Sequence, residues 1–134
     1  MKNSFLLAVS AVLLLSVSAF AHKGATGVFK ERMDNFKASQ LALKQILAAS
    51  KRNDFEGIVP LANQIKNRAE IMPTKFPSGS DGPPSEAAPA IWIDFKGFKS
   101  AAEENFEAAS LLELTALNGD AKATTKAIKQ LAGT

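Results

Sequence analysis

Apolar residues recur three or four positions apart in four segments of this chain, and no segment shows the strict alternation of a half-buried strand. The segments span residues 25–50, 54–72, 89–117 and 121–134. This spacing places apolar side chains on one side of a helix, so each segment predicts an amphipathic helix. Four such helices can bury their apolar sides against one another. We expect an all-α fold, an antiparallel up-down-up-down four-helix bundle.

The first segment also predicts which of its sides is buried. Its largest apolar side chains repeat at helical spacing, with Gln40 in the same row. The lysines lie seven residues apart on another side, as expected of a solvated surface. The expected core-facing residues are Phe29, Met33, Phe36, Leu43 and Leu47.

Capping residues and prolines set the limits of the second helix. Asn53 or Asp54 can cap its first turn by accepting a backbone N–H. Pro60 removes a backbone donor, so the helix either begins just before it or kinks there. Pro73 ends the helix and opens a loop rich in Pro, Gly and Ser that extends to residue 88.

The third and fourth helices are joined by a short turn. Pro89 suits the first turn of the third helix, and Asn118-Gly119 suits its end. Asp120 can cap the fourth helix. At 1.5 Å per residue the first and third helices reach about 39 and 43 Å, but the fourth only about 20 Å. We therefore expect the fourth helix to be cut short.

The first 21 residues have the pattern of a secretory signal peptide. Lys2 precedes an apolar run, and small residues with an A-x-A site end at Ala21. A membrane anchor is the alternative, but serines interrupt a run already short for a bilayer. We expect cleavage after Ala21, export to a bacterial periplasm, no membrane span in the mature protein, and one bundle domain over residues 22–134.

The composition excludes several functions. The formal net charge of +3 is small and gives no case for nucleic-acid binding. The chain has no cysteine and one histidine, His22, so it cannot form a Ser-His-Asp, Cys-His or zinc-thiolate site in its core. Residues Glu103, Glu104, Glu107 and Glu113 have no Glu-x-x-His partner and read as a solvated face. We expect a protein that is not an enzyme.

Arg32, Met33 and Phe36 share the start of the first helix, and two interpretations remain open. Met and aromatic residues at helical spacing are usually core. They also suit a cofactor pocket, because Phe36 offers an apolar face, Met33 a soft thioether and Arg32 a charge for carboxylates.

The whole mature chain resembles the cytochrome c' (cytochrome c prime) family of periplasmic four-helix cytochromes. The likeness lies in "GATGVFKERMDNFKASQLALKQI", "IMPTKFPSGS", "AAPAIWIDFKGFKSAAEENFEAAS" and "AKATTKAIKQLAGT". The resemblance implies covalent haem c inside the bundle, electron transfer with periplasmic redox partner proteins, and possible homodimers. It also implies a long connection between the second and third helices.

The resemblance assigns roles to five residues. Arg32 matches the arginine near a haem propionate, and Phe36 takes the distal position, where low-spin relatives often have Met. Phe36 cannot bind iron, so the site leans towards an open, guarded iron face. Met33 is the alternative metal ligand. Phe76 and Trp92 match aromatic positions around the loop and the third helix.

The family's C-x-x-C-H motif, which supplies the attachment cysteines and the proximal His, is absent from this sequence. In the family it follows residues like "LAGT", so we expect it directly after Thr134 in a complete chain. A partial sequence, a truncated gene and a protein that has lost haem all remain open. Three functions follow: haem-based electron transfer, binding of a small gas such as nitric oxide, or a haem-free periplasmic helical adaptor. Non-covalent b-type haem would also need a core His.

Overall fold

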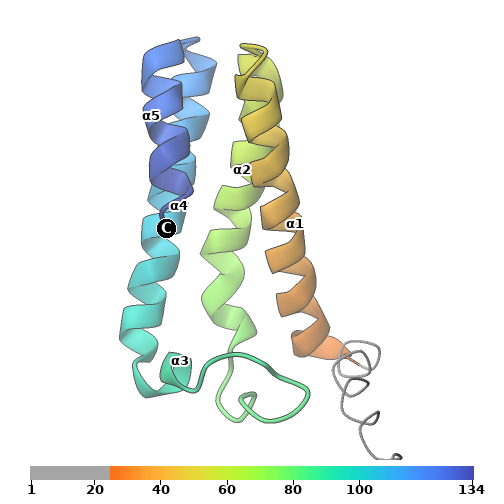
Figure 1. Ribbon diagram of the computed structural model, residues 1–134. Helices are drawn as coiled ribbons and strands as arrows, with labels where there is room; N and C mark the ends of the chain where they lie inside the picture. Colours follow the sequence, from red (N-terminus) through yellow and green to blue (C-terminus); the bar gives the residue numbers. More distant parts are fainter. Residues whose placement is uncertain (1–24) are drawn as a thin grey trace, which may run out of the picture.

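The computed structural model describes residues 25–134, which form a bundle of long helices (Figure 1). No strand occurs in this range, so the predicted all-α bundle is confirmed. The predicted signal peptide and His22 lie outside the described residues. The helices are α1 (Gly27–Ser50), α2 (Phe55–Ile71), the 3-10 helix η1 (Met72–Lys75), α3 (Ala90–Ile93), α4 (Phe95–Leu117) and α5 (Ala121–Leu131).

Aspartates cap the first turns of α2, α4 and α5. Asp54, Asp94 and Asp120 each accept a hydrogen bond of 2.9 Å from the backbone N–H three residues later. Two of these caps were predicted, and Gly119 also ends α4 with the predicted positive φ of 66°. The helix of 17 residues that Asp54 caps runs on through Pro60.

The prediction of one continuous helix over residues 89–117 is wrong. The segment divides at Asp94, whose backbone angles of φ −120° and ψ 64° are not helical. Asp94 closes the single turn of α3 with its own N–H, which bonds the carbonyl of Ala90, and caps α4 with its carboxylate. The side chain thus satisfies an amide at the start of α4, and this favours a new helix over an unbroken one.

The core is built around α2, which packs against both α1 and α4. Small side chains occupy much of it, so the helices can approach closely. The buried residues of α4 lie in its second half, from Ala108 to Ala116, whereas Phe95 in its first turn is 36% exposed. The core residues are Ala42, Ile46, Ala49, Ile58, Ala62, Ile65, Ala108, Ala109, Leu112, Ala116, Ala127, Ile128 and Leu131.

The predicted core side of α1 is wrong by a fraction of a turn. Ala42, Ile46 and Ala49 are buried, whereas Phe36 and Leu47 are 49% and 45% exposed. The two rows are adjacent on the helix, but only the row of smaller residues contacts the neighbouring helices tightly. The larger side chains instead border open space between α1 and the α4–α5 side of the bundle.

The length of α5 creates that space. It has 11 residues beside the 23 of α4, so it covers only the upper part of α4 in Figure 1. It ends at Leu131, three residues earlier than predicted. Below the end of α5, the side of α4 that α5 covers higher up has no neighbouring helix among the described residues (Figure 1). This arrangement positions the candidate site.

Candidate cofactor site

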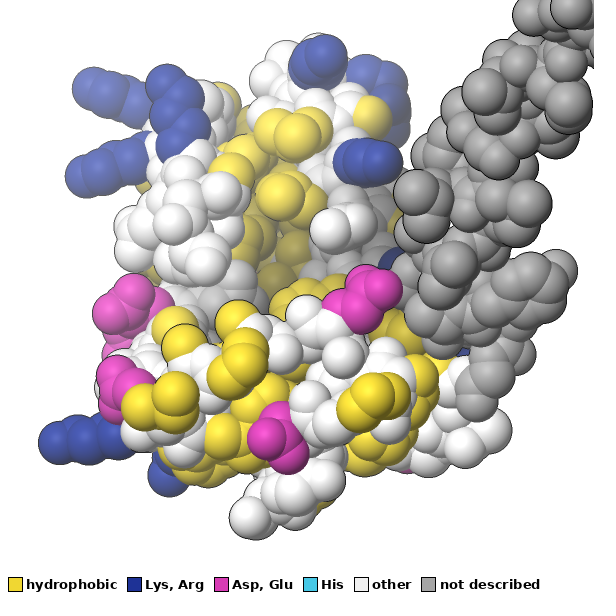
Figure 2. Space-filling model, turned by 60° about the horizontal axis from the view of Figure 1, so that its bottom comes forward, with side chains coloured by type: hydrophobic (Ala, Val, Ile, Leu, Met, Phe, Trp, Pro, Cys, Tyr) yellow, Lys and Arg dark blue, Asp and Glu magenta, His cyan; other side chains and the backbone are white. Residues whose placement is uncertain are grey.

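A cavity of about 490 Å³, here called the inner cavity, lies between α1, α2, α4 and the end of α5. Figure 2 shows a hollow with hydrophobic side chains between the α4–α5 side on the left and the α1 side on the right. Most of the lining is apolar, and its volume lies in the range of about 300–1,000 Å³ common for cofactor sites. The lining residues are Phe36, Ser39, Gln40, Leu43, Ile65, Ala69, Met72, Phe98, Ala101, Ala102, Asn105, Leu131, Ala132 and Thr134.

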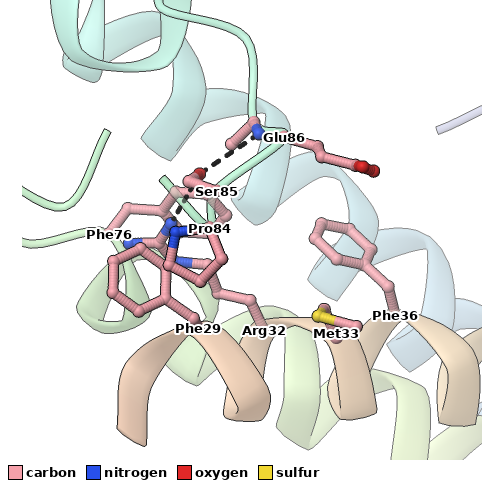
Figure 3. Close-up of a pocket in the computed structure, with 9 residues that line it drawn as sticks. Phe29, Arg32, Met33, Phe36, Phe76, Pro84, Ser85 and Glu86 are labelled. Atoms are coloured by element: carbon pink, nitrogen blue, oxygen red, sulfur yellow. Dashed lines mark hydrogen bonds between the residues drawn. The ribbon is translucent and has the colours of Figure 1, made fainter. Parts of the chain in front are cut away.

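A second cavity of about 220 Å³, the loop cavity, lies between α1 and the loop after η1. In Figure 3 the side chains from α1 face those of the loop across it. Phe36 lines both cavities, so its ring stands at their boundary. The lining residues are Phe29, Arg32, Met33, Phe36, Phe76, Pro84, Ser85, Glu86 and Ala87.

Arg32 fastens this loop to α1. It is only 4% exposed, and its guanidinium donates to the carbonyls of Lys75 (2.5 Å) and Ser80 (2.9 Å) and to the hydroxyl of Ser85 (3.2 Å). It also donates to the hydroxyl of Ser80. A buried charge is tolerated only when such partners replace its water. Burial lowers the pKa of Arg32, but an arginine stays protonated in proteins.

Three aromatic rings surround the same guanidinium. Its central carbon lies 4.3 Å from the centroid of Phe76, 5.1 Å from that of Phe29 and 5.5 Å from that of Trp92. Phe76 packs in turn on Trp92 at 5.7 Å and on Phe98 at 4.7 Å between centroids. The faces of these rings attract a cation. The arginine therefore links α1, the loop, α3 and α4.

The structure gathers the predicted site residues at one end of the bundle. Arg32, Met33, Phe36 and Phe76 all line the loop cavity. Trp92 does not line it, but its ring contacts Phe76 and its indole N–H donates to the carbonyl of Pro77 at 3.0 Å. Of these five residues, only Phe36 also lines the inner cavity.

Sequence reasoning missed the partners of Arg32. Ser80 and Ser85 lie in a loop that the sequence marked only as rich in Pro, Gly and Ser. An arginine beside an apolar row was the available signal, because a buried guanidinium requires several acceptors. The sequence did not indicate which loop atoms would meet it, since they lie 43 to 53 residues away.

The reading of Glu113 as part of a solvated face is wrong, although Glu103, Glu104 and Glu107 are exposed. The Glu113 side chain lies between α2 and α4 and is 19% exposed. It forms an ion pair with Lys66 and accepts a hydrogen bond of 2.9 Å from the side-chain amide of Asn63. The hydrogen bond from Lys66 has the largest effect on the pKa of Glu113 and lowers it, and Asn63 lowers it further. Burial acts in the opposite direction, but the pKa stays below its usual value. The pair is a contact between helices.

The described residues contain no group of three or more His, Cys, Asp or Glu side chains arranged to hold a metal ion. Among the same residues, no helix combines the length and the apolar character needed to cross a bilayer.

Comparisons with known proteins agree with this architecture. A family model described as cytochrome c' matches residues 27–134. The cytochrome c' of Rhodospirillum rubrum is 30% identical over 141 residues, covering 100% of this chain and 92% of that protein.

Two solved structures share the fold. The cytochrome c' of Thermochromatium tepidum superposes with a TM-score of 0.73 at 18% identity, covering 79% of this chain and 86% of that one. A cytochrome c' with ligand-controlled dimer dissociation gives a TM-score of 0.71 at 19% identity, with the same coverage. The match over residues 27–134 and the likeness to the Rhodospirillum rubrum protein lead to one conclusion: this chain belongs to the cytochrome c' family.

Proposed function

We propose that this protein is a periplasmic haem-binding electron-transfer protein, not an enzyme, and that its inner cavity receives haem c. The observation that carries the proposal is the cavity itself: about 490 Å³ of mainly apolar space at helical positions of α1, α2, α4 and α5. A macrocycle with two apolar faces and an anionic edge suits such a lining.

The residues of this sequence provide part of a haem c site. The apolar lining, with Phe36, Leu43 and Phe98 from two helices, suits the flat faces of a macrocycle. The sequence has no cysteine, so its own residues cannot form the thioether bonds of haem c. The one histidine, His22, lies outside the described residues. The lining therefore supports burial of the group, whereas covalent attachment would need the family's C-x-x-C-H motif, which this sequence does not contain.

When bound, haem supplies a redox-active iron, and the chain supplies burial and electrostatics. Arg32 places a positive charge beside the loop cavity, where it favours the anionic edge of the group. Phe76 and Trp92 hold that arginine in place. Phe36, at the boundary between the two cavities, would lie against the group and offers it no ligand atom. Met33 lines only the loop cavity and remains the alternative ligand.

A second candidate function is the binding of a small gas such as nitric oxide at an open iron face. The position of Phe36 favours it, because this side chain offers no ligand atom and stands between two apolar cavities. A ring there limits which molecules approach. We also propose that the protein forms a homodimer, because a cytochrome c' of the same fold shows ligand-controlled dimer dissociation.

Reading the gene beyond the codon for Thr134 tests the proposal first. An in-frame Cys-x-x-Cys-His, followed by a Soret band in the protein matured with the cytochrome c attachment machinery, is the expected result. Spectra with and without nitric oxide then separate electron transfer at a closed iron from gas binding at an open one. A stop codon at that point, with a purified protein that shows no Soret band, would overturn the proposal and favour the haem-free adaptor.

A further inference from the structure

Two rows of lysines lie on helices α1 and α5, next to the inner cavity. Those of α1 are seven residues apart and share one side of the helix. Those of α5 lie opposite the buried residues Thr124, Ala127 and Ile128 and face solvent. The lysine face consists of Lys37, Lys44, Lys51, Lys122, Lys126 and Lys129.

These lysines are not neutralised within the described residues. None of the six forms an ion pair there, whereas Lys30, Lys66 and Lys75 do. No Asp or Glu occurs in residues 35–53 or 121–134. The acidic side chains lie mainly on α4 and on the loop end of the bundle. The small total charge therefore conceals two rows of positive charge that have no acidic partner in the described residues.

The lysine face borders apolar side chains. Phe36 and Leu47 are 49% and 45% exposed, and Phe36 lines the inner cavity. Figure 2 shows Lys and Arg side chains on the α5 side and the α1 side, with the hydrophobic hollow between them. An apolar centre inside a charged rim is the usual anatomy of a protein–protein interface.

We propose that this lysine face docks an acidic protein, with the apolar hollow at its centre. The inference rests on the proposed electron-transfer function, because a redox partner must approach the cavity that holds the cofactor. The apolar side chains are recessed in a hollow, which suits a protein surface better than the plane of a bilayer. All six charges are lysines, so the face lacks the planar bidentate donors that favour phosphates.

NMR titration of the ¹⁵N-labelled protein with a flavodoxin, a soluble acidic redox protein, tests the docking directly. We expect shift changes confined to α1, α5 and the border of the hollow, with an affinity that falls as salt rises. The variant Lys44→Glu/Lys126→Glu should bind at least about tenfold more weakly. The matched variant Lys96→Glu/Lys99→Glu changes the net charge equally on α4 and should bind like the parent.

Equal weakening in both double variants, or shifts spread over α4, would overturn the proposal. Tighter binding to vesicles with 30% phosphatidylglycerol or to a 20-base-pair DNA duplex would also overturn it in favour of that partner. Lys44→Gln/Lys126→Gln, which keeps the helices but removes charge, should give an intermediate loss. The readout needs no haem, so a protein without a Soret band that still docks flavodoxin would refute only the proposed function.

Discussion

The guanidinium carbon of Arg32 lies 4.3 Å from the centroid of the Phe76 ring, and the two residues are only 4% and 2% exposed. This contact joins the first turns of α1 to the chain segment that follows η1. It places a permanent positive charge beside the loop cavity and fixes the residues that close it. The stability of this end of the bundle and the environment of the proposed cofactor therefore depend on one buried arginine.

Replacing Arg32 should destabilise the protein strongly. Arg32→Ala removes four hydrogen bonds and leaves the Ser80 and Lys75 carbonyls without their donor, at a cost of about 2–4 kcal/mol. Arg32→Lys should recover less than half of this, because an ammonium cannot reach the same acceptors in one plane. Urea unfolding measures both values. A loss below about 0.5 kcal/mol for Arg32→Ala would contradict the assignment.

Truncation of Phe76 should open a void where three rings meet. Phe76→Ala should lower the free energy of unfolding by about 3–5 kcal/mol, since this side chain packs on Phe98 and Trp92. Ile93 is 85% exposed and serves as the control, because Ile93→Ala should change stability by no more than about 0.5 kcal/mol. Similar losses in the two variants would show that the aromatic cluster contributes little. Thermal or urea unfolding distinguishes these results.

The break between α3 and α4 predicts a measurable capping contribution from Asp94. Asp94→Ala should destabilise the protein by about 1 kcal/mol, because the N–H of Gly97 loses its acceptor. Asp94→Asn should retain most of the stability, since an amide oxygen also accepts at this position. If Asp94→Ala is as stable as the parent in urea, the carboxylate does not determine where α4 begins.

The depressed pKa of Glu113 predicts a loss of stability in acid. The carboxylate has a lower pKa when folded than its usual value of about 4.3, so it stabilises the fold above that pH. This contribution should disappear as the pH falls through the folded pKa. Urea unfolding between pH 7 and pH 3 should show a shallower decline for Glu113→Gln than for the parent. Glu107→Gln, at an exposed site, should follow the parent curve.

Phe36 should control access to the inner cavity in the haem-loaded protein. Phe36→Ala joins the two cavities that this ring separates, so a small gas should associate several times faster than in the parent. Stopped-flow mixing with nitric oxide measures the rate. Leu41, which is 57% exposed and lines neither cavity, is the control position. Equal rates for Phe36→Ala and Leu41→Ala would exclude Phe36 from this role.

The sequence by itself determined the helices and most of their limits. Local chemistry sets these features: apolar spacing selects a helical period, Asp54 and Asp120 satisfy the first amides, and Gly119 adopts the positive φ that ends α4. The motifs near Arg32 and Trp92 also indicated the family, because they contain the residue types found in family members, in the same order along the chain.

The tertiary structure decided which side of α1 is buried and where the charges gather. Spacing alone did not separate the buried row with Ala42 from the adjacent row with Phe36, because that choice depends on how closely neighbouring helices pack. The residues that accept hydrogen bonds from Arg32 lie far from it in the sequence. The lysine face likewise combines residues of α1 and α5. Such contacts depend on how the helices assemble, so only the folded bundle determined the two cavities and the face beside them.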